Sequence, residues 1–219
     1  FFIWFLIISP LCPILFYHII MIVILFNFSW MFFNLILAFI AVCLGFLFLF
    51  TANKLEKSIY AFFWLLFLPN TAYLYTDLIN LIHQWGRYNN SERLVLLFQY
   101  GALEIMCVIT TVLALYPFER YILGSNHIKR RISPTNAIIL INFVVGFGIT
   151  LGRVERINSW DLLFALDKVL GAGFRIISSP RLLLLTILFG LISNFIYFLF
   201  RRPVIRQFKI YLSRVGVKV

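Results

Sequence analysis

Residues 179–202 read SPRLLLLTILFGLISNFIYFLFRR. No charged residue interrupts the run from Leu182 to Phe200; a Ser-Pro pair precedes it and two arginines follow it. About 20 apolar residues are enough for a helix to cross the hydrocarbon core of a bilayer. Because that core offers the backbone no water to bond, a crossing segment must be helical. The stretch therefore predicts a transmembrane helix over residues 181–200.

The composition extends this prediction to the whole chain. Of its 219 residues 63% are hydrophobic and 12% are charged, whereas a soluble domain is about half apolar and a quarter charged. We therefore expect residues 1–219 to form one integral membrane domain, an all-α polytopic transmembrane helical bundle. About six spans are expected, at residues 4–26, 30–50, 58–79, 94–116, 134–152 and 181–200.

Several residues predict where these spans begin and end. Proline interrupts helical hydrogen bonding, so the first span should bend at Pro10 and Pro13 or begin after them, and Pro117 should stop the fourth. A short turn near residues 27–30 is expected to separate the first two spans. Ser133, followed by proline, has the pattern of a helix N-cap and predicts the start of the fifth span.

The connection between the fifth and sixth spans, residues 153–181, carries apolar residues at helical spacing. Charged residues avoid this stripe, which is typical of an interfacial helix lying on the membrane surface. A re-entrant segment fits the same pattern. The stripe comprises Leu162, Leu163, Leu166, Val169, Leu170, Phe174 and Ile177.

The basic residues predict an orientation. One set of connections, together with the basic tail 201–219, holds 12 of the 19 Lys and Arg residues, and the opposite set holds 7. An excess of Lys and Arg marks the cytoplasmic side. The protein is therefore expected in a cell membrane (a bacterial plasma membrane, or a thylakoid if photosynthetic). Both termini should lie on the cytoplasmic side and loops 80–93 and 153–181 on the outside. The net charge of +11 then indicates contact with anionic lipid and not with nucleic acid.

The third expected span carries polar residues that are out of place in a membrane. Asn70, Tyr73 and Asp77 are three and four residues apart, so they share one helical face that Asn80 extends. Pro69 removes a backbone donor beside them, and Asn70 could supply a polar partner there. Such a face should point into the bundle. It could be a substrate or ion site near the outer leaflet, or a polar seam that joins helices.

A second polar cluster follows the fifth span. Gly148 and Gly152 form a small-xxx-small pair that lets another helix approach closely. The arginines after them have the geometry to bind a phosphate or carboxylate headgroup, or they could simply pair with a nearby carboxylate. The candidate ligand-binding residues of this segment are Arg153, Glu155, Arg156, Asn158, Trp160 and Asp161.

Glu104 lies near the middle of the fourth expected span. An intramembrane carboxylate is a candidate proton relay, and a protonated glutamate that hydrogen-bonds between helices is the alternative. The three cysteines have neither disulfide nor metal-site spacing. No glycine-rich phosphate loop, nucleophile elbow, zinc helix or haem-attachment motif is present. The sequence indicates no metal and no cofactor, and it identifies no catalytic residue.

Two segments resemble the signatures of a family of bacterial membrane proteins catalogued as domain of unknown function 1361. They are WLLFLPNTAYLYTDLIN at residues 64–80 and LGRVERINSWD at residues 151–161. The order of the expected spans also fits, so the likeness extends from about Trp30 onward. The family often has histidine at the position of Asn80, and the asparagine weakens the case for a metal pair with Asp77. The resemblance implies a fold and a membrane location, and no reaction.

Three functions compete at this point. The polar clusters favour binding or conversion of a lipid-linked, envelope or anionic ligand. The lack of a recognisable catalytic set and the aromatic-rich exterior favour a non-catalytic subunit of a larger respiratory or photosynthetic membrane complex. The third hypothesis is a small transporter that uses Glu104 and the break at Pro69. Membrane lipids are the expected partners, with membrane proteins as further possible ones.

Overall fold

The computed structural model describes the backbone of residues 2–125 and 132–214, and the side chains of residue 25 and of residues 27–125 and 132–214. These segments form helices joined by short loops. The helices are α1 (Phe2–Phe50), α2 (Lys54–Thr76), α3 (Leu78–Trp85), α4 (Asn90–Gly124), α6 (Pro134–Arg153), α7 (Asp161–Phe164), α8 (Leu166–Ser178) and α9 (Pro180–Arg214).

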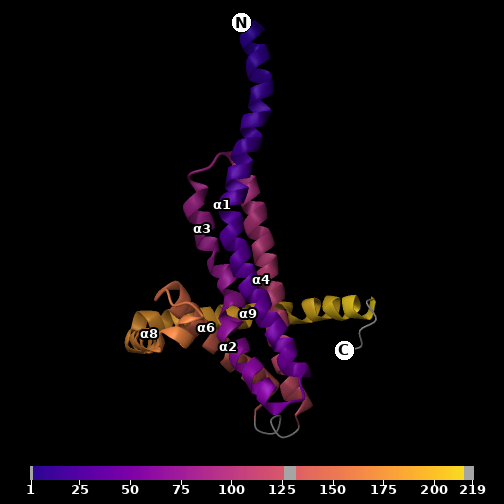
Figure 1. The fold of residues 1–219 in the computed structure, drawn as a ribbon, viewed down its shortest axis with the longest axis vertical. Helices are drawn as coiled ribbons and strands as arrows, with labels where there is room; N and C mark the ends of the chain where they lie inside the picture. The colour runs from indigo at the N-terminus through magenta and orange to yellow at the C-terminus, as the bar shows by residue number, and fades with distance from the viewer. Residues whose placement is uncertain (1, 126–131, 215–219) are drawn as a thin grey trace.

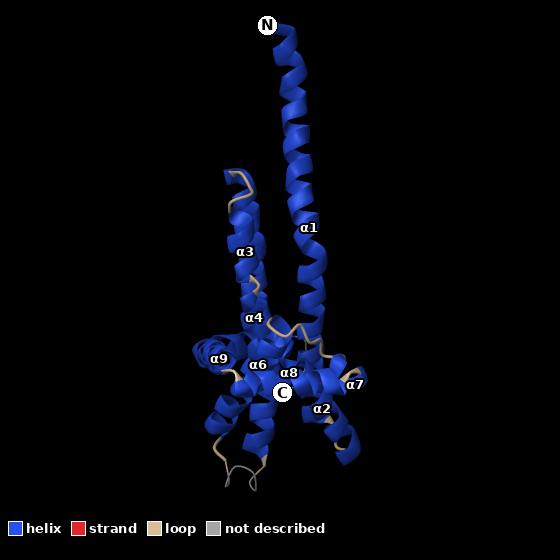
Figure 2. Ribbon diagram, turned by 90° about the vertical axis from the view of Figure 1, so that its left-hand side faces the viewer, coloured by secondary structure: helices blue, strands red, loops and turns tan. Residues whose placement is uncertain are grey.

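The helices pack as two groups that cross each other. Helices α2 and α4 pack along α1, with α3 continuing beside α4 (Figure 1). Helix α9 packs on α6 and runs across the long axis of α1, so that Figure 2 shows it nearly end-on. The candidate site described below lies where α2 of the first group meets α6 of the second.

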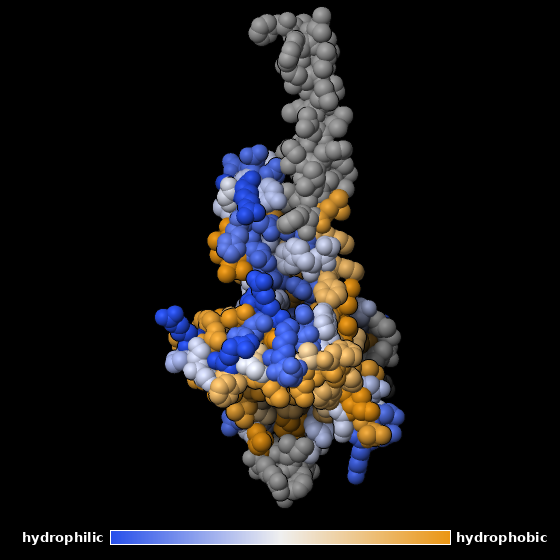
Figure 3. Space-filling view, turned by 60° about the vertical axis from the view of Figure 1, so that its left-hand side comes forward, coloured by the Kyte–Doolittle hydropathy of each residue, from blue (hydrophilic) through white to orange (hydrophobic). Residues whose placement is uncertain are grey.

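Within the described residues, four helical segments are long and apolar enough to cross a membrane: Asn27–Phe50, Asn90–Gly124, Pro134–Arg153 and Pro180–Arg214. Their large apolar side chains are often exposed, as with Phe98 at 80% and Phe195 at 66%. Hydrophobic residues cover much of the surface around the crossing, while hydrophilic ones gather along the α3 side (Figure 3). Extended apolar surface is unusual on a soluble monomer. The described residues confirm the all-helical prediction, and they contain four candidate spans where six were expected.

The first two expected spans are one continuous helix, α1, which corrects the turn predicted at residues 27–30. The side chain of Asn27 is fully buried and donates to Oε1 of Gln84 at 3.0 Å. Neither glycine nor proline lies between residues 27 and 30. The polar residue that suggested a turn is therefore satisfied by a tertiary contact, and the helix continues past it.

The third expected span, 58–79, is interrupted at Asp77. The amide of Asp77 bonds to the carbonyl of Leu74 at 3.0 Å, which is the tight i−3 pattern often found in a last helical turn. Helix α2 ends at Thr76 and α3 begins at Leu78. The break arises where the Asp77 side chain is bound by partners on other helices.

Helix α4 runs through Pro117 to Gly124, so the predicted stop at Pro117 is wrong. Pro117 is buried, and the next turn holds the buried carboxylate of Glu119. That carboxylate pairs with Arg201 and accepts a hydrogen bond from the Tyr197 hydroxyl at 2.9 Å. Pro117 has no backbone amide to donate, and the contacts of Glu119 with α9 stabilise α4 in the turn that follows it.

The connection 153–181 contains the short helix α7 and the longer α8, and most of the expected apolar stripe is exposed along them. Its exposed members are Leu163, Leu166, Leu170, Phe174 and Ile177, whereas Val169 is buried on the side that carries Ala172. Helix α8 therefore has one apolar side against the body, where it contacts α6 and α9, and a second that is uncovered in the described structure. The interfacial location of this helix stays a prediction.

The last two long helices begin as predicted and α9 ends later. Ser133 caps α6 by accepting from the amide of Asn136 at 3.1 Å, with proline at the first turn. Helix α9 begins at Pro180 but continues through Pro203 to Arg214, well past the expected end at residue 200. Most of the basic tail is thus helical, while residues 215–219 lie outside the described part.

Close packing holds α6 and α9 together. A Cβ on Gly146 would lie 2.5 Å from the carbonyl oxygen of Thr186, so only glycine permits this approach. Helix α9 thereby reaches α6 closely enough for Thr186 to donate to Thr150 at 3.0 Å. The loop before α4 lies at the far end of α3, away from α7 and α8 (Figure 1). The two polar loops that were expected together on the outside therefore lie at different heights along α1.

Candidate functional site

The glycine pair of α6 brings this helix against α2. A Cβ on Gly148 would lie 2.3 Å from Cγ of Pro69, and one on Gly152 would lie 3.3 Å from the ring of Tyr73. The proline ring is rigid, so the site at Gly148 accepts no larger side chain without a shift of backbone. The predicted close approach of another helix at this pair is confirmed, and the helix is α2.

An ion pair lies one turn beyond this contact. Arg153, the last residue of α6, pairs with Asp77 at the α2–α3 break. Its Nε and Nη2 atoms also donate to Oγ1 of Thr76, at 2.9 and 2.6 Å. Asn34 on α1 donates to the second carboxylate oxygen of Asp77 at 3.1 Å. Asp77 is 1% exposed, so three helices meet around a buried and fully paired carboxylate.

The guanidinium of Arg153 also stacks on Tyr73. Its Cζ lies 4.3 Å from the centre of the ring, which is within the range of a cation–π interaction. The carboxylate on one side and the aromatic face on another hold the guanidinium of Arg153 in place. Of the two alternatives left open by the sequence, the arrangement is the simple ion pair.

The loop after α6 returns over α2. Arg156 has a φ of 54°, the left-handed conformation that turns the chain. Ser159 then accepts from the amide of Asn70 at 3.2 Å and donates to the carbonyl of Leu66 at 3.4 Å. Asn70 also donates to the carbonyl of Phe67 at 3.1 Å. Asn70 thus supplies polar contacts beside Pro69, as expected, and also fastens the loop.

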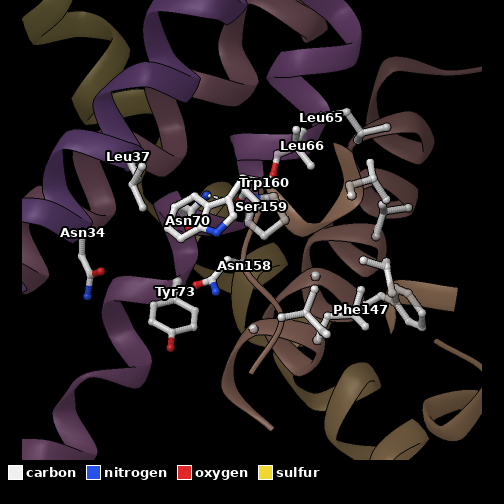
Figure 4. A pocket seen from close by; sticks show the side chains of 18 of the residues that line it. Asn34, Leu37, Leu65, Leu66, Asn70, Tyr73, Phe147, Asn158, Ser159 and Trp160 are labelled. Atoms are coloured by element: carbon white, nitrogen blue, oxygen red, sulfur yellow. Dashed lines mark hydrogen bonds between the residues drawn. The ribbon is translucent and has the colours of Figure 1, made fainter. Parts of the chain in front are cut away.

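These elements enclose a cavity of about 340 Å³ between α1, α2, α6 and the loop. Figure 4 shows Asn70, Ser159 and Trp160 grouped together, with Tyr73 and Asn158 beside them. The remaining walls are aliphatic and aromatic. They comprise Phe33, Leu37, Phe62, Leu65, Leu66, Pro69, Val144, Phe147, Leu151, Ile157, Leu162 and Val169, with Asn34 and the two glycines completing the lining.

Two carboxylates of this region, Glu155 and Asp161, are also paired. Glu155 accepts from Nε of Arg175 on α8 at 2.9 Å. The carboxylate of Asp161 accepts from the backbone amide of Asn158 at 2.9 Å and from Nζ of Lys168 at 3.2 Å. These contacts, the backbone amide first, lower the pKa of Asp161 below its usual value. The loop is therefore tied to α8 by two ion pairs, which hold one side of the cavity in place.

The structure divides the predicted site residues into two sets. Those that line the cavity are Asn70, Tyr73, Asn158 and Trp160. Those that lie near it without lining it are Asp77, Arg153, Glu155, Arg156 and Asp161. Asn80 lies beyond the break on α3, and neither its side chain nor that of Arg156 bonds to another described residue. The predicted polar face of the third span therefore ends at Asp77.

Glu104 stands apart from both polar clusters. It lies on α4, outside the cavity lining, and its Oε1 atom is buried without a hydrogen-bond partner among the described residues. The contact between helices that the sequence offered as an alternative is therefore not formed at this atom. The relay hypothesis for Glu104 stays a prediction.

Three residues of the site were missed from the sequence. Asn34 on α1 donates its side-chain amide to Asp77, and Thr76 accepts from Arg153. Ser159 accepts from Asn70 and so joins the loop to α2. A side-chain amide at position 34, within the apolar run 30–50, is costly against lipid, and this signal could have identified Asn34. Thr76 and Ser159 lie next to residues that were identified, and nothing else in the sequence distinguishes them.

Comparison with known proteins supports one assignment. No curated protein and no solved structure matches the chain. The family model described as a protein of unknown function, DUF1361, matches residues 33–196, which include both clusters of the site and the helices that carry them. This agrees with the resemblance of residues 64–80 and 151–161. The chain therefore belongs to the DUF1361 family.

Proposed function

We propose that this protein binds a membrane-embedded amphiphile in the cavity between α2, α6 and the loop 154–160. The apolar part of the ligand lies against the aromatic and aliphatic walls, and an uncharged polar group meets Asn70, Asn158 and Ser159. The observation that carries the proposal is the cavity itself, about 340 Å³ with polar side chains gathered at one part of an apolar lining. Apolar walls with a few placed polar groups are typical of ligand sites.

The side chains at the edge of the cavity support entry from the lipid. Phe33 on α1 and Phe62 and Leu65 on α2 line it and are also exposed on the protein surface. A hydrocarbon chain can therefore pass between them without crossing a polar barrier. Entry from this side suits a lipid-like molecule better than a water-soluble one.

The paired charges favour an uncharged polar group. Arg153 is taken by Asp77, Arg175 by Glu155 and Lys168 by Asp161. Among the described residues Arg156 is unpaired but does not line the cavity, so a phosphate inside it would have to displace one of these carboxylates, whereas a hydroxyl or amide could bond to Asn70 and Asn158 at once. Tyr73 and Trp160 add flat apolar faces on which a sugar or similar ring could stack.

Retention of lipid by purified protein tests the proposal. Leu37→Trp fills the cavity, and Leu184→Trp makes the same change at an exposed site on α9. Native mass spectrometry after exposure to a total membrane lipid extract should show a bound amphiphile in the wild type and in Leu184→Trp. The adduct should be lost from Leu37→Trp. Equal retention by the two variants, or an empty wild type, would contradict the proposal.

We also propose the orientation that was expected from the sequence. The concentration of Lys and Arg in the C-terminal part of α9 still favours the cytoplasmic side for that end. Membership of a larger complex and a transport role for Glu104 stay predictions. A co-purifying chain would support the first, and a loss of transport in Glu104→Gln would support the second.

A further inference from the structure

The C-terminal part of α9 combines a basic surface with an apolar one. Residues 201–214 read RRPVIRQFKIYLSR and contain no acidic residue. Arg202, Arg206 and Lys209 are four and three residues apart, so they lie on one helical face, and all three are exposed. In Figure 1 this part of α9 projects beyond α4.

None of the acidic residues of the chain lies in this segment. All eight lie in the described part, and the only one that pairs with α9 is Glu119, whose partner is Arg201. Within the described residues, Arg202, Arg206 and Lys209 form no ion pair. Three like charges on one face repel each other, so this surface is complementary to an external anion.

The opposite face of the same segment is apolar. Phe200, Val204 and Phe208 line a groove of about 420 Å³ whose other wall is Ile109 and Leu113 on α4. These α9 residues are four apart, and the helical rotation places them away from the face of Arg202, Arg206 and Lys209. The segment is thus amphipathic, with cations on one side and an open hydrocarbon groove on the other.

We propose that residues 201–214 bind anionic phospholipid at the membrane surface. The phosphates lie against Arg202, Arg206 and Lys209, and acyl chains occupy the groove between α9 and α4. A helical segment with a cationic face and an apolar face binds anionic lipid through its apolar area and its electrostatic attraction, and arginine binds phosphate through paired donors. The apolar groove behind the cations selects a bilayer over nucleic acid, which would meet the charges alone.

Matched variants of the full chain test this site. The triple variant Arg202→Gln/Arg206→Gln/Lys209→Gln removes three charges from one face. The control Lys54→Gln/Arg87→Gln/Arg120→Gln removes three exposed charges spread over α2, the loop before α4, and α4. Binding of phosphatidylglycerol and of phosphatidylcholine to protein in neutral micelles is measured by native mass spectrometry or by a fluorescent lipid probe.

The wild type and the control should prefer the anionic lipid, and the α9 triple variant should lose the preference by roughly a hundredfold, because each basic residue near an anionic surface contributes to the attraction. A charge-retaining variant, Arg202→Lys/Arg206→Lys/Lys209→Arg, should bind as the wild type does, which separates loss of charge from misfolding. The proposal is overturned if both Gln variants bind alike, if the wild type does not distinguish the two lipids, or if inorganic phosphate alone displaces the lipid completely.

Discussion

The crossings of α2 with α6 and of α4 with α9 are each fastened by a buried carboxylate and an arginine, and yet only the first adjoins a cavity with polar lining. At the first crossing Asp77 pairs with Arg153. At the second, Glu119 pairs with Arg201. The hollow beside the second pair is lined almost wholly by apolar side chains.

An ion pair between crossing helices does not by itself mark a ligand site, because the two crossings share it and differ in their cavities. In both places it joins helices that are more than 70 residues apart in the sequence. What distinguishes the first crossing is the group of uncharged polar side chains above it, Asn70, Asn158 and Ser159, set into an apolar wall. The charged residues hold the walls, and the amides and hydroxyl face the space between them.

The two ion pairs should differ in their effect on stability, and the largest effect is expected at the first. Arg153→Ala leaves the carboxylate of Asp77, with a side chain 2% exposed, without its cation. Removing one partner of such a pair costs about 3–5 kcal/mol, so the midpoint of denaturation in mixed micelles should fall steeply. The double variant Asp77→Leu/Arg153→Met should recover most of the loss, because an apolar pair of similar volume needs no partner. Equal instability of the single and double variants would show that the pair has another role.

At the second crossing the same change should cost less. Arg201 is more exposed than Arg153, and in Arg201→Ala the carboxylate of Glu119 keeps its hydrogen bond from Tyr197. The loss expected is about 1–3 kcal/mol, the cost of a buried group left partly unsatisfied. The combined change Arg201→Ala/Tyr197→Phe should be worse than the sum of the two alone, since it removes both partners of one carboxylate. Additive losses in the same denaturation assay would argue against this shared role.

A third variant examines the packing that brings the first crossing together. Gly148→Ala places a methyl group against the rigid ring of Pro69, and overpacking of this kind typically costs about 1–3 kcal/mol. Gly101→Ala on α4 is the matched control, because nothing lies within 4 Å of the added Cβ. That control should be neutral or more stable by up to about 1 kcal/mol, from helix propensity. If both alanine variants behaved alike, the close contact of α2 with α6 would not be limiting.

The sequence predicted most of the first crossing because its signals are local. A glycine pair spaced by four residues and polar residues spaced by three and four can be recognised within single segments, and Asp77 and Arg153 stood out as charges at the ends of apolar runs. The expected order of the spans also placed the Asp77 segment and the Arg153 segment on the same side of the membrane. The two segments were paired correctly, and of the two roles left open for the arginines the pairing of Arg153 with a carboxylate is the one observed.

The second crossing and the helix boundaries were missed because they depend on distant contacts. Glu119 is followed by an arginine and a proline precedes it, which is the pattern of a loop, and only Arg201 and Tyr197 show it to be buried. In the same way Asn27 suggested a turn, and only its hydrogen bond to Gln84, 57 residues away, explains why a polar residue stands inside a helix. No spacing rule within a segment could indicate either partner.

The smallest effect is expected at the edge of the first crossing, where Asp161 ties the loop to α8. The folded state lowers the pKa of Asp161, chiefly through the amide of Asn158 and then through Lys168. A lowered pKa stabilises the folded state at pH values above the unfolded pKa, about 3.9, and this contribution is lost as the pH falls through the folded value. Asp161→Asn should therefore be slightly less stable than the wild type at pH 7, and the difference should vanish in acid. Asp167→Asn removes a carboxylate that forms no ion pair with described residues, and it should show no such convergence. A difference for Asp161→Asn that persisted unchanged below pH 3 would mean that its contacts hold the loop by shape and not by charge.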